Sequence, residues 1–274
     1  MTEGAALPVV LVGAGNMGGA MLSGWLDGDR DGSSIVVIDP SPSAAITAKL
    51  AEKGASSYPS APEGMVAGIL FLAVKPQMME TVLPAIARLV GPQTAVVSVA
   101  AGTTLAVLSR HLGDVAMVRA MPNTPAMIGR GITGAYANAA VTEAQRRQVN
   151  DLLAVSGPVE WLASEADIDA VTAVSGSGPA YVFHLVECMA EAGRKLGLPA
   201  DLAMRLARET VSGAGELMRR SSDDAAQLRK NVTSPGGTTA AALAVLMADN
   251  GLQPLFDAAL EAARTRAQEL GQRS

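Results

Sequence analysis

The feature that most constrains this chain is the turn Gly-Ala-Gly-Asn-Met-Gly at residues 13–18, which directly follows an apolar run at residues 7–12. In such a turn the first glycine allows a tight bend, the second lets the backbone approach a ligand, and the third lets the next helix pack against the strand. The start of that helix offers free N–H groups and a positive dipole to phosphate. We therefore predict a dinucleotide-binding unit whose pyrophosphate contacts are Gly13, Ala14, Gly15, Asn16, Met17 and Gly18.

Apolar runs of strand length recur through the first half of the chain and alternate with segments of helical pattern. The runs lie at residues 35–38, 69–74, 94–99, 115–121 and 132–136. This alternation predicts an α/β Rossmann-type fold with a doubly wound parallel sheet. Beyond residue 162 the pattern is helical only, over residues 165–175, 179–196, 200–220, 223–232, 237–249 and 252–271. We predict a dinucleotide-binding domain at residues 1–163 and an all-helical substrate and dimerisation domain at residues 164–274.

Asp39 ends the second predicted strand at the position where dinucleotide-binding domains carry an acidic residue. Its carboxylate is suited to accept hydrogen bonds from the ribose hydroxyls and to repel a 2′-phosphate, which favours NADH over NADPH. We include Pro40 and Ser41 in this cofactor site. The alternative is that Asp39 only caps the turn that it forms with Pro40 and Ser41.

Three further clusters follow predicted strands, where ligands bind in open α/β sheets. The predicted cofactor contacts in them are Ala73, Val74, Lys75, Pro76, Ala100, Ala101, Gly102, Asn123 and Thr124. Prolines on both sides of residues 123–124 stiffen that loop. Each cluster alone would be an ordinary turn, but three at one sheet edge favour a nicotinamide site.

The helical half contains a second glycine-rich helix start, Ser-Pro-Gly-Gly-Thr-Thr at residues 234–239. Gly236 and Gly237 leave backbone N–H groups uncovered, which suits a carboxylate ligand. Thr238 and Thr239 add hydroxyl groups, whereas a simple cap needs a single one. We therefore favour substrate binding at this loop over simple capping.

Composition excludes several classes of partner and favours a cytoplasmic location. The formal net charge of −5 offers no basic face for nucleic acid. The longest apolar stretch, residues 65–74, is too short for a membrane span, and Cys188 is the single cysteine, as in proteins of reducing compartments. We assign no metal ligands.

Titratable groups are scarce in the helical half, and this bears on the reaction. His111 and His184 are the only histidines, and helical spacing predicts that His184 packs against neighbouring apolar side chains. A hydroxy-acid dehydrogenase needs a base for the hydroxyl proton. A C=N bond can be protonated in solution, so its reduction depends mainly on positioning. The composition therefore favours an imine substrate.

Five segments together resemble the Δ1-pyrroline-5-carboxylate reductase family, and they span nearly the whole chain in that family's order. They are residues 13–18, 73–76, 121–125, 169–181 and 231–239. The resemblance implies reduction of pyrroline-5-carboxylate to L-proline by NADPH or NADH, the last step of proline biosynthesis. It also implies a helical domain that interleaves with a partner's to form a dimer, and assembly into larger rings such as a decamer.

The resemblance also implies roles for individual residues. Thr239 would hydrogen-bond the ring nitrogen and is the predicted catalytic residue, and the backbone at residues 237–239 would hold the substrate carboxylate. The full set of implied substrate contacts is Glu165, Ser177, Asn231, Ser234, Gly236, Gly237, Thr238 and Thr239. Many relatives carry a small polar or basic residue in place of Asp39 and favour NADPH, so this chain departs from the family there.

Other functions stay open on the sequence. One is reduction of a related cyclic imine acid, such as the six-membered piperideine analogue. Another is a dinucleotide-binding regulatory protein without chemistry, which would not need the loop at residues 236–239. A hydroxy-acid dehydrogenase is disfavoured by the missing base.

Overall fold

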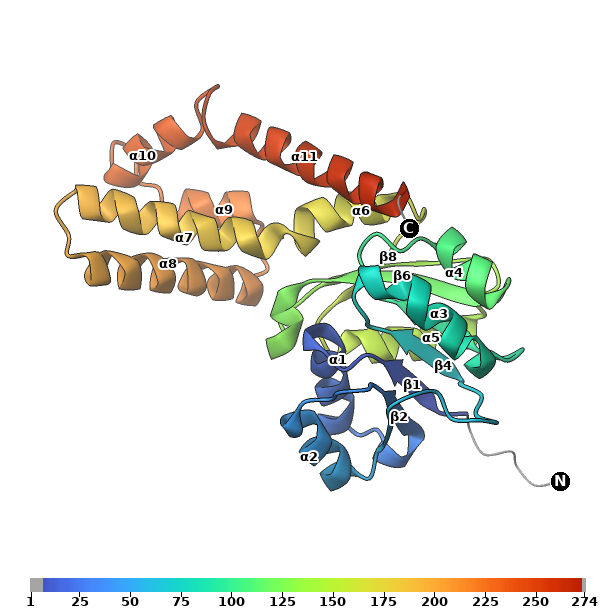
Figure 1. Cartoon of the computed structure of the whole chain (residues 1–274). Helices are drawn as coiled ribbons and strands as arrows, with labels where there is room; N and C mark the ends of the chain where they lie inside the picture. The colour runs from blue at the N-terminus through green and yellow to red at the C-terminus, as the bar shows by residue number, and fades with distance from the viewer. Residues whose placement is uncertain (1–6, 273–274) are drawn as a thin grey trace. The chain divides into compact units, whose positions relative to one another are not determined.

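The computed structural model describes residues 7–272, which form two compact units (Figure 1). The first contains the described residues up to Gly176 together with those from Ala263 onward, and the second is Ser177–Ala262. Residues 1–6 and 273–274, the outer ends of the two predicted domains, lie outside the described residues.

Within residues 7–272, eight strands form one sheet in the order β3-β2-β1-β4-β5-β6-β7-β8. The strands are β1 (Val9–Val12), β2 (Ile35–Ile38), β3 (Ser56–Tyr58), β4 (Ile69–Leu72), β5 (Ala95–Ser98), β6 (Ala116–Pro122), β7 (Thr133–Ala137) and β8 (Val159–Trp161). The predicted Rossmann-type sheet is confirmed, with β1 at the point where the strand order reverses. β3 and β8 were not predicted, because Ser-Ser-Tyr and Val-Glu-Trp are short and lack a continuous apolar run.

The sheet is parallel except at one place, where β6 and β7 run antiparallel. Residues 123–132 join these two strands and contain only a short 3-10 helix, η4 (Thr124–Ile128). A parallel crossover needs a connection of about a dozen residues or more, usually a helix. The short connection therefore turns β7 back along β6 and departs from a purely parallel sheet.

The central strands are buried on both faces, and alternate residues pack into two separate cores. Leu11 and Phe71 lie in one core, covered by α1 (Asn16–Asp27), α2 (Ala44–Lys53) and α5 (Glu143–Ala154). Val10 and Leu70 lie in the other, covered by α3 (Met79–Ile86) and α4 (Leu105–Leu112). This is the doubly wound arrangement that the sequence predicts.

Trp25 on α1 joins the layers of the first core, which contains few aromatic side chains. Its ring meets Phe71 edge to face with centroids 5.1 Å apart. Its indole N–H donates to the carbonyl of Leu152 on α5 at 2.8 Å, so the buried polar atom is satisfied. One side chain thus ties two helices to the centre of the sheet.

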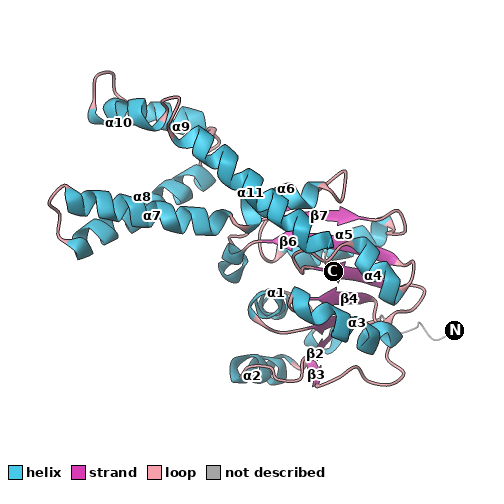
Figure 2. Ribbon diagram, turned by 45° about the horizontal axis from the view of Figure 1, so that its top comes forward, coloured by secondary structure: helices cyan, strands magenta, loops and turns pink. Residues whose placement is uncertain are grey.

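Helices alone make up the second unit, as the cyan ribbons in Figure 2 show. They are α7 (Gly178–Lys195), α8 (Ala200–Arg220), α9 (Ala225–Asn231), α10 (Thr238–Leu246) and the first part of α11 (Leu252–Gln272). In place of the single helix predicted at residues 165–175, the first unit has α6 (Asp167–Val171) followed by a π-helical turn, Thr172–Gly176.

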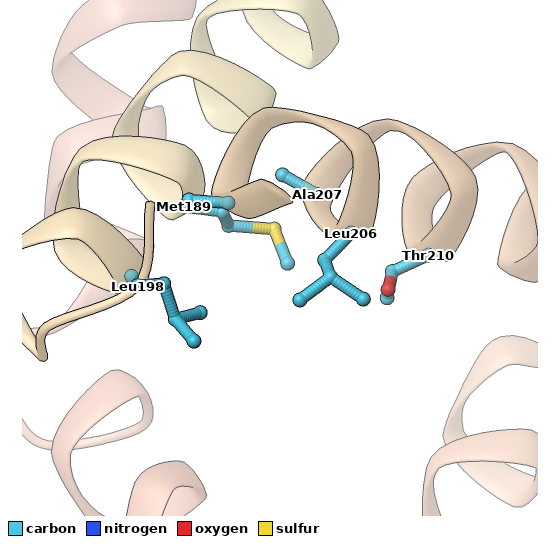
Figure 3. A pocket seen from close by; sticks show the side chains of 7 residues that line it. Met189, Leu198, Leu206, Ala207 and Thr210 are labelled. Carbon is cyan, nitrogen blue, oxygen red and sulfur yellow. The ribbon is translucent and has the colours of Figure 1, made fainter. Parts of the chain in front are cut away.

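The helical unit leaves much of its apolar surface uncovered in a single chain. Phe183 is 64% exposed and Val245 is 71% exposed, and α10 is apolar with no buried residue. Figure 3 shows Met189, Leu198 and Leu206 around an open hollow of about 120 Å³ between α7 and α8. Helices that are apolar on every side are normally buried, so these faces are suited to another protein chain.

We expect Gly18→Ala to destabilise the first unit by about 1–3 kcal/mol, because the added methyl would overlap the Gly13 carbonyl and approach the Ala73 Cβ to 3.0 Å. Gly15→Ala is the matched control. An added Cβ there meets no atom within 4 Å, so its effect should stay within about 1 kcal/mol. Urea unfolding of both variants checks this, and equal stabilities would contradict it.

Candidate dinucleotide and substrate sites

The glycine turn of residues 13–18 lies against the loop that follows β4. Gly13 has φ +88°, and an added Cβ there would lie 2.8 Å from Val74 Cγ1. An added Cβ on Gly18 would lie 3.0 Å from Ala73 Cβ. The fold thus brings two predicted cofactor segments together at the point where the sheet order reverses, and both contacts require glycine.

The start of α1 is open to a ligand. Gly15 is the N-cap residue, no side chain caps the helix, and no atom lies within 4 Å of an added Cβ. The first backbone N–H groups of α1 therefore have no side-chain cap. A pyrophosphate fits this arrangement in charge and in hydrogen bonding.

Asp39 lies beside the turn and accepts two backbone hydrogen bonds. Oδ2 accepts from the Ala14 N–H at 2.7 Å, and Oδ1 accepts from the Ser41 N–H at 2.8 Å. Asp39 therefore caps the turn at Ser41, and its other carboxylate oxygen is held at the glycine turn itself. Pro40 forms the exposed bend between Asp39 and Ser41.

A hollow of about 460 Å³ opens next to Asp39, within the usual size range of a ligand site. Polar groups on its wall include Asn16, Ser41 and Ser43. No lysine or arginine is among the residues that line it, so nothing there would neutralise a 2′-phosphate. Ser43 was not predicted, although it is the N-cap of α2 and its position after Asp39 was a usable signal.

The remaining predicted cofactor loops lie at the same edge of the sheet, after β4, β5 and β6. Lys75 is exposed and precedes a 3-10 turn that begins at Pro76. Ala100 and Ala101 lead into Gly102, whose φ is +75° and which packs against Leu270 near the end of α11. The C-terminal helix therefore supports the loop after β5, a contact that the sequence pattern did not predict.

In the loop after β6, the side chain of Asn123 forms a hydrogen bond within the loop. Its Oδ1 accepts from the Ile132 N–H at 3.0 Å and closes the loop, while Thr124 begins η4. The Asn123 oxygen is therefore engaged, and its amide nitrogen is the group that remains for a ligand.

The second glycine-rich helix start has the open geometry that the sequence predicts. Gly236 has φ +71°, and the N–H of Gly237 donates to the Ser234 carbonyl at 3.0 Å. Gly237 then caps α10 without any side-chain hydrogen bond. Among the described residues no partner is recorded for the hydroxyls of Thr238 and Thr239, the first two residues of α10. A carboxylate fits this helix start.

The other predicted substrate residues are more dispersed. Asn231 ends α9 and is held by Gln227 at 2.7 Å and by Asp223 at 3.3 Å. Ser177 precedes α7, and its carbonyl accepts from the Ala180 N–H. Glu165 belongs to the first compact unit, whereas Ser177, Asn231 and residues 234–239 belong to the second.

One sequence inference about a helical residue was wrong, and one buried charged residue was not predicted. His184 was predicted to be packed, but its side chain is 74% exposed and pairs with Glu187 at 2.9 Å, so this inference was wrong for the single chain. Arg119 was not singled out, although a charged residue inside the apolar run 115–121 is an unusual feature; it is buried between Glu165 and Asp169.

Residues 7–272 contain neither a candidate metal site nor a candidate membrane span. No cluster of three or more histidine, cysteine or acidic side chains is placed to bind a metal ion. No helix in the same range combines the length and hydrophobicity of a membrane span.

Comparison with known families divides the chain much as its fold does. Residues 165–270 match the model for pyrroline-5-carboxylate reductase dimerisation. Residues 8–102 match the model for NADP oxidoreductase, coenzyme F420-dependent. The second match covers the glycine turn and Asp39, and the first covers the loop at residues 234–239.

Individual relatives align over most of the chain. The pyrroline-5-carboxylate reductase of Pseudomonas aeruginosa is 42% identical over 96% of this chain and 97% of its own length. A solved reductase structure from Coxiella burnetii has a TM-score of 0.88 at 35% identity and covers 96% of this chain and 98% of that one. A Plasmodium falciparum pyrroline carboxylate reductase structure with NADP bound has a TM-score of 0.80 at 29% identity, covering 97% and 98%. This chain belongs to the pyrroline-5-carboxylate reductase family.

Proposed function

We propose that this chain reduces Δ1-pyrroline-5-carboxylate to L-proline with a reduced nicotinamide dinucleotide, the last step of proline biosynthesis. The observation that carries the proposal is the presence of two uncapped, glycine-rich helix starts in a member of this family. One begins α1 at Gly15, and the other begins α10 at Gly237. The reaction needs one anion site for the cofactor pyrophosphate and another for the substrate carboxylate.

When bound, the reduced cofactor supplies a hydride to the imine carbon. The chain's own contribution is to bind and orient. The N–H groups at the start of α1 hold the pyrophosphate, and those of residues 237–239 hold the substrate carboxylate. The hydroxyl of Thr239 orients the ring nitrogen and helps to keep it protonated. Because that nitrogen is protonated in solution, no histidine or lysine acid is required.

We assign the remaining predicted residues to the same two functions. Residues 1–163 bind the cofactor and residues 164–274 bind the substrate and a partner chain. Cofactor contacts come from residues 13–18, 39–41, 73–76, 100–102 and 123–124. Substrate contacts come from Glu165, Ser177, Asn231, Ser234 and residues 236–239. The open geometry at Gly15 and Gly236 supports the two central assignments.

We expect purified protein to oxidise NADH when pyrroline-5-carboxylate is added, with a higher kcat/KM than for NADPH. Asp39 and the absence of a basic side chain around the hollow carry this preference. Asp39→Ser should raise the NADPH/NADH ratio of kcat/KM by about 10- to 100-fold, because like-charge repulsion in a site costs several kcal/mol. Absorbance at the NADH band measures each rate.

The six-membered piperideine analogue serves as the substrate control in this assay. A higher kcat/KM for that analogue would replace the proposed substrate. No oxidation with either imine would contradict the proposed activity, and a strong NADPH preference of the wild type would contradict the role of Asp39.

Thr239→Ala should lower kcat/KM for pyrroline-5-carboxylate by about 10- to 100-fold, the range for loss of one positioned hydrogen bond. Its NADH affinity, measured by fluorescence titration, should not change. Thr81→Ala, at an exposed position of α3, is the matched control, and its kcat/KM should equal that of the wild type. Unchanged kinetics of Thr239→Ala would remove this residue from the site.

We infer that the chain assembles into dimers and that these form a larger ring such as a decamer. The matched dimerisation model and the uncovered apolar faces of α7, α8 and α10 support self-association. Light scattering should give an even multiple of the 27.9 kDa chain mass, and ten chains for the ring. Elution at the mass of one chain would contradict the dimer.

We infer a cytoplasmic site of action from composition. Cys188 is the one cysteine, so no internal disulfide is available to the chain. Proteins of reducing compartments need none. The proposed reaction also uses a reduced cofactor that is kept within the cell.

A further inference from the structure

Arg119 is the one buried charged residue among residues 7–272, with 5% of its surface exposed. It lies in the middle of β6, between Val118 and Ala120, which both face the first core. A buried guanidinium is tolerated only where carboxylates compensate its charge and its donors find acceptors. The contacts of Arg119 therefore indicate what the fold uses this residue for.

Its guanidinium bridges two carboxylates that follow β8 in the chain. Nη1 lies 3.2 Å from Glu165 Oε1, and Nη2 lies 3.3 Å from Asp169 Oδ1. Two carboxylates on one cation leave a net negative charge at this point. Arginine is suited to the task because its planar fork presents two donors in a set geometry.

Glu165 extends the network to a third segment. Its Oε1 also accepts from the Leu105 N–H at 2.9 Å, at the start of α4 and three residues after Gly102. Its Oε2 accepts no hydrogen bond among the described residues, and 29% of the side chain is exposed. One oxygen is thus held by the protein, and the other stays open to a ligand.

Asp169, the second carboxylate beside Arg119, lies in the middle of α6. This helix leads into the π-helical turn at Thr172–Gly176, where an added Cβ on Gly176 would lie 2.7 Å from Met121 Cε. π-helical turns often occur at functional sites. The buried cation therefore lies at the junction of the loop after β5, the end of β6 and the segment that leads to Ser177.

We propose that Arg119 is a positioning residue for the reduction. It holds Glu165 so that Oε2 faces the bound ligands, and it sets the loop after β5 and the π-helical turn relative to the sheet. The proposal rests on the proposed function, because it assumes that Glu165 lies at the reacting end of the site. Arg119 itself touches neither substrate nor cofactor.

The test compares Arg119→Met and Arg119→Lys with the wild type. We expect Arg119→Met to lower kcat about a hundredfold, the effect of a misplacement of about 1 Å at a reacting centre. The Kd for NADH should change less than about threefold, because the ion pairs of Arg119 within the described residues are with Glu165 and Asp169 and not with the turn at residues 13–18. The kcat of Arg119→Lys should be about tenfold higher than that of Arg119→Met, because an ammonium group still compensates the two carboxylates.

Arg147→Met is the matched surface control. That arginine is 67% exposed and, within residues 7–272, forms an ion pair with Glu143 on the surface, so its loss should leave kcat and KM unchanged. A purely structural role for Arg119 would lower thermal stability without this split between kcat and the NADH Kd. Wild-type kinetics for Arg119→Met, or equal losses in Arg119→Met and Arg119→Lys, would overturn the proposal.

A double-mutant cycle keeps the test decisive if Arg119→Met does not fold. Glu165→Gln retains an oxygen for the Leu105 N–H but loses the charge. If Arg119 acts through Glu165, the two substitutions should not be additive. The double variant Arg119→Lys with Glu165→Gln should then lose no more kcat than the less active of the two single variants. Additive losses would overturn the proposal. A wild type inactive with pyrroline-5-carboxylate would count against the proposed function instead.

Discussion

The close approach of Gly18 to Gly13 is the constraint on which the first unit depends. It lets α1 leave the carboxyl end of β1 at short range, so that Trp25 reaches Phe71 and Leu152 in the core. The same approach leaves the first N–H groups of α1 without partners at the point where the strand order reverses. Packing and ligand binding therefore share one cause: a side chain at either position would push the helix away and close the anion site.

The helical unit obeys a different constraint, since its own core is small. Within the described part of this unit the buried apolar residues are alanines, Ala190, Ala203 and Ala207, at the contact of α7 and α8. Many of its large apolar side chains are exposed, among them Phe183, Leu196 and Val245. A unit of this kind gains most of its hydrophobic stabilisation from another chain, in agreement with the matched dimerisation model. Stability and self-association are then coupled, and stability depends on protein concentration.

The proposed chemistry depends on two helix starts that are each suited to bind an anionic group but are built differently. At Gly15 the anion site is built on a strand, a turn and a helix locked by tight packing. At Gly237 it is built on a loop with a positive φ at Gly236 and open space around it. A rigid site suits a cofactor common to many enzymes, whereas the second loop carries hydroxyls that match one substrate. Under the proposed function, substrate specificity is assigned mainly to residues 231–239.

Sequence alone determined the glycine turn, the buried central strands, the helical second half and the loop at residues 234–239. Each is specified by neighbours within a few residues, through backbone sterics, periodicity or uncapped N–H groups. Only the tertiary structure decided the support of Gly102 by Leu270 and the burial of Arg119 between Glu165 and Asp169. Those features join residues that are distant along the chain. Local propensity carries no information about which distant charges will meet, because that depends on how the layers pack.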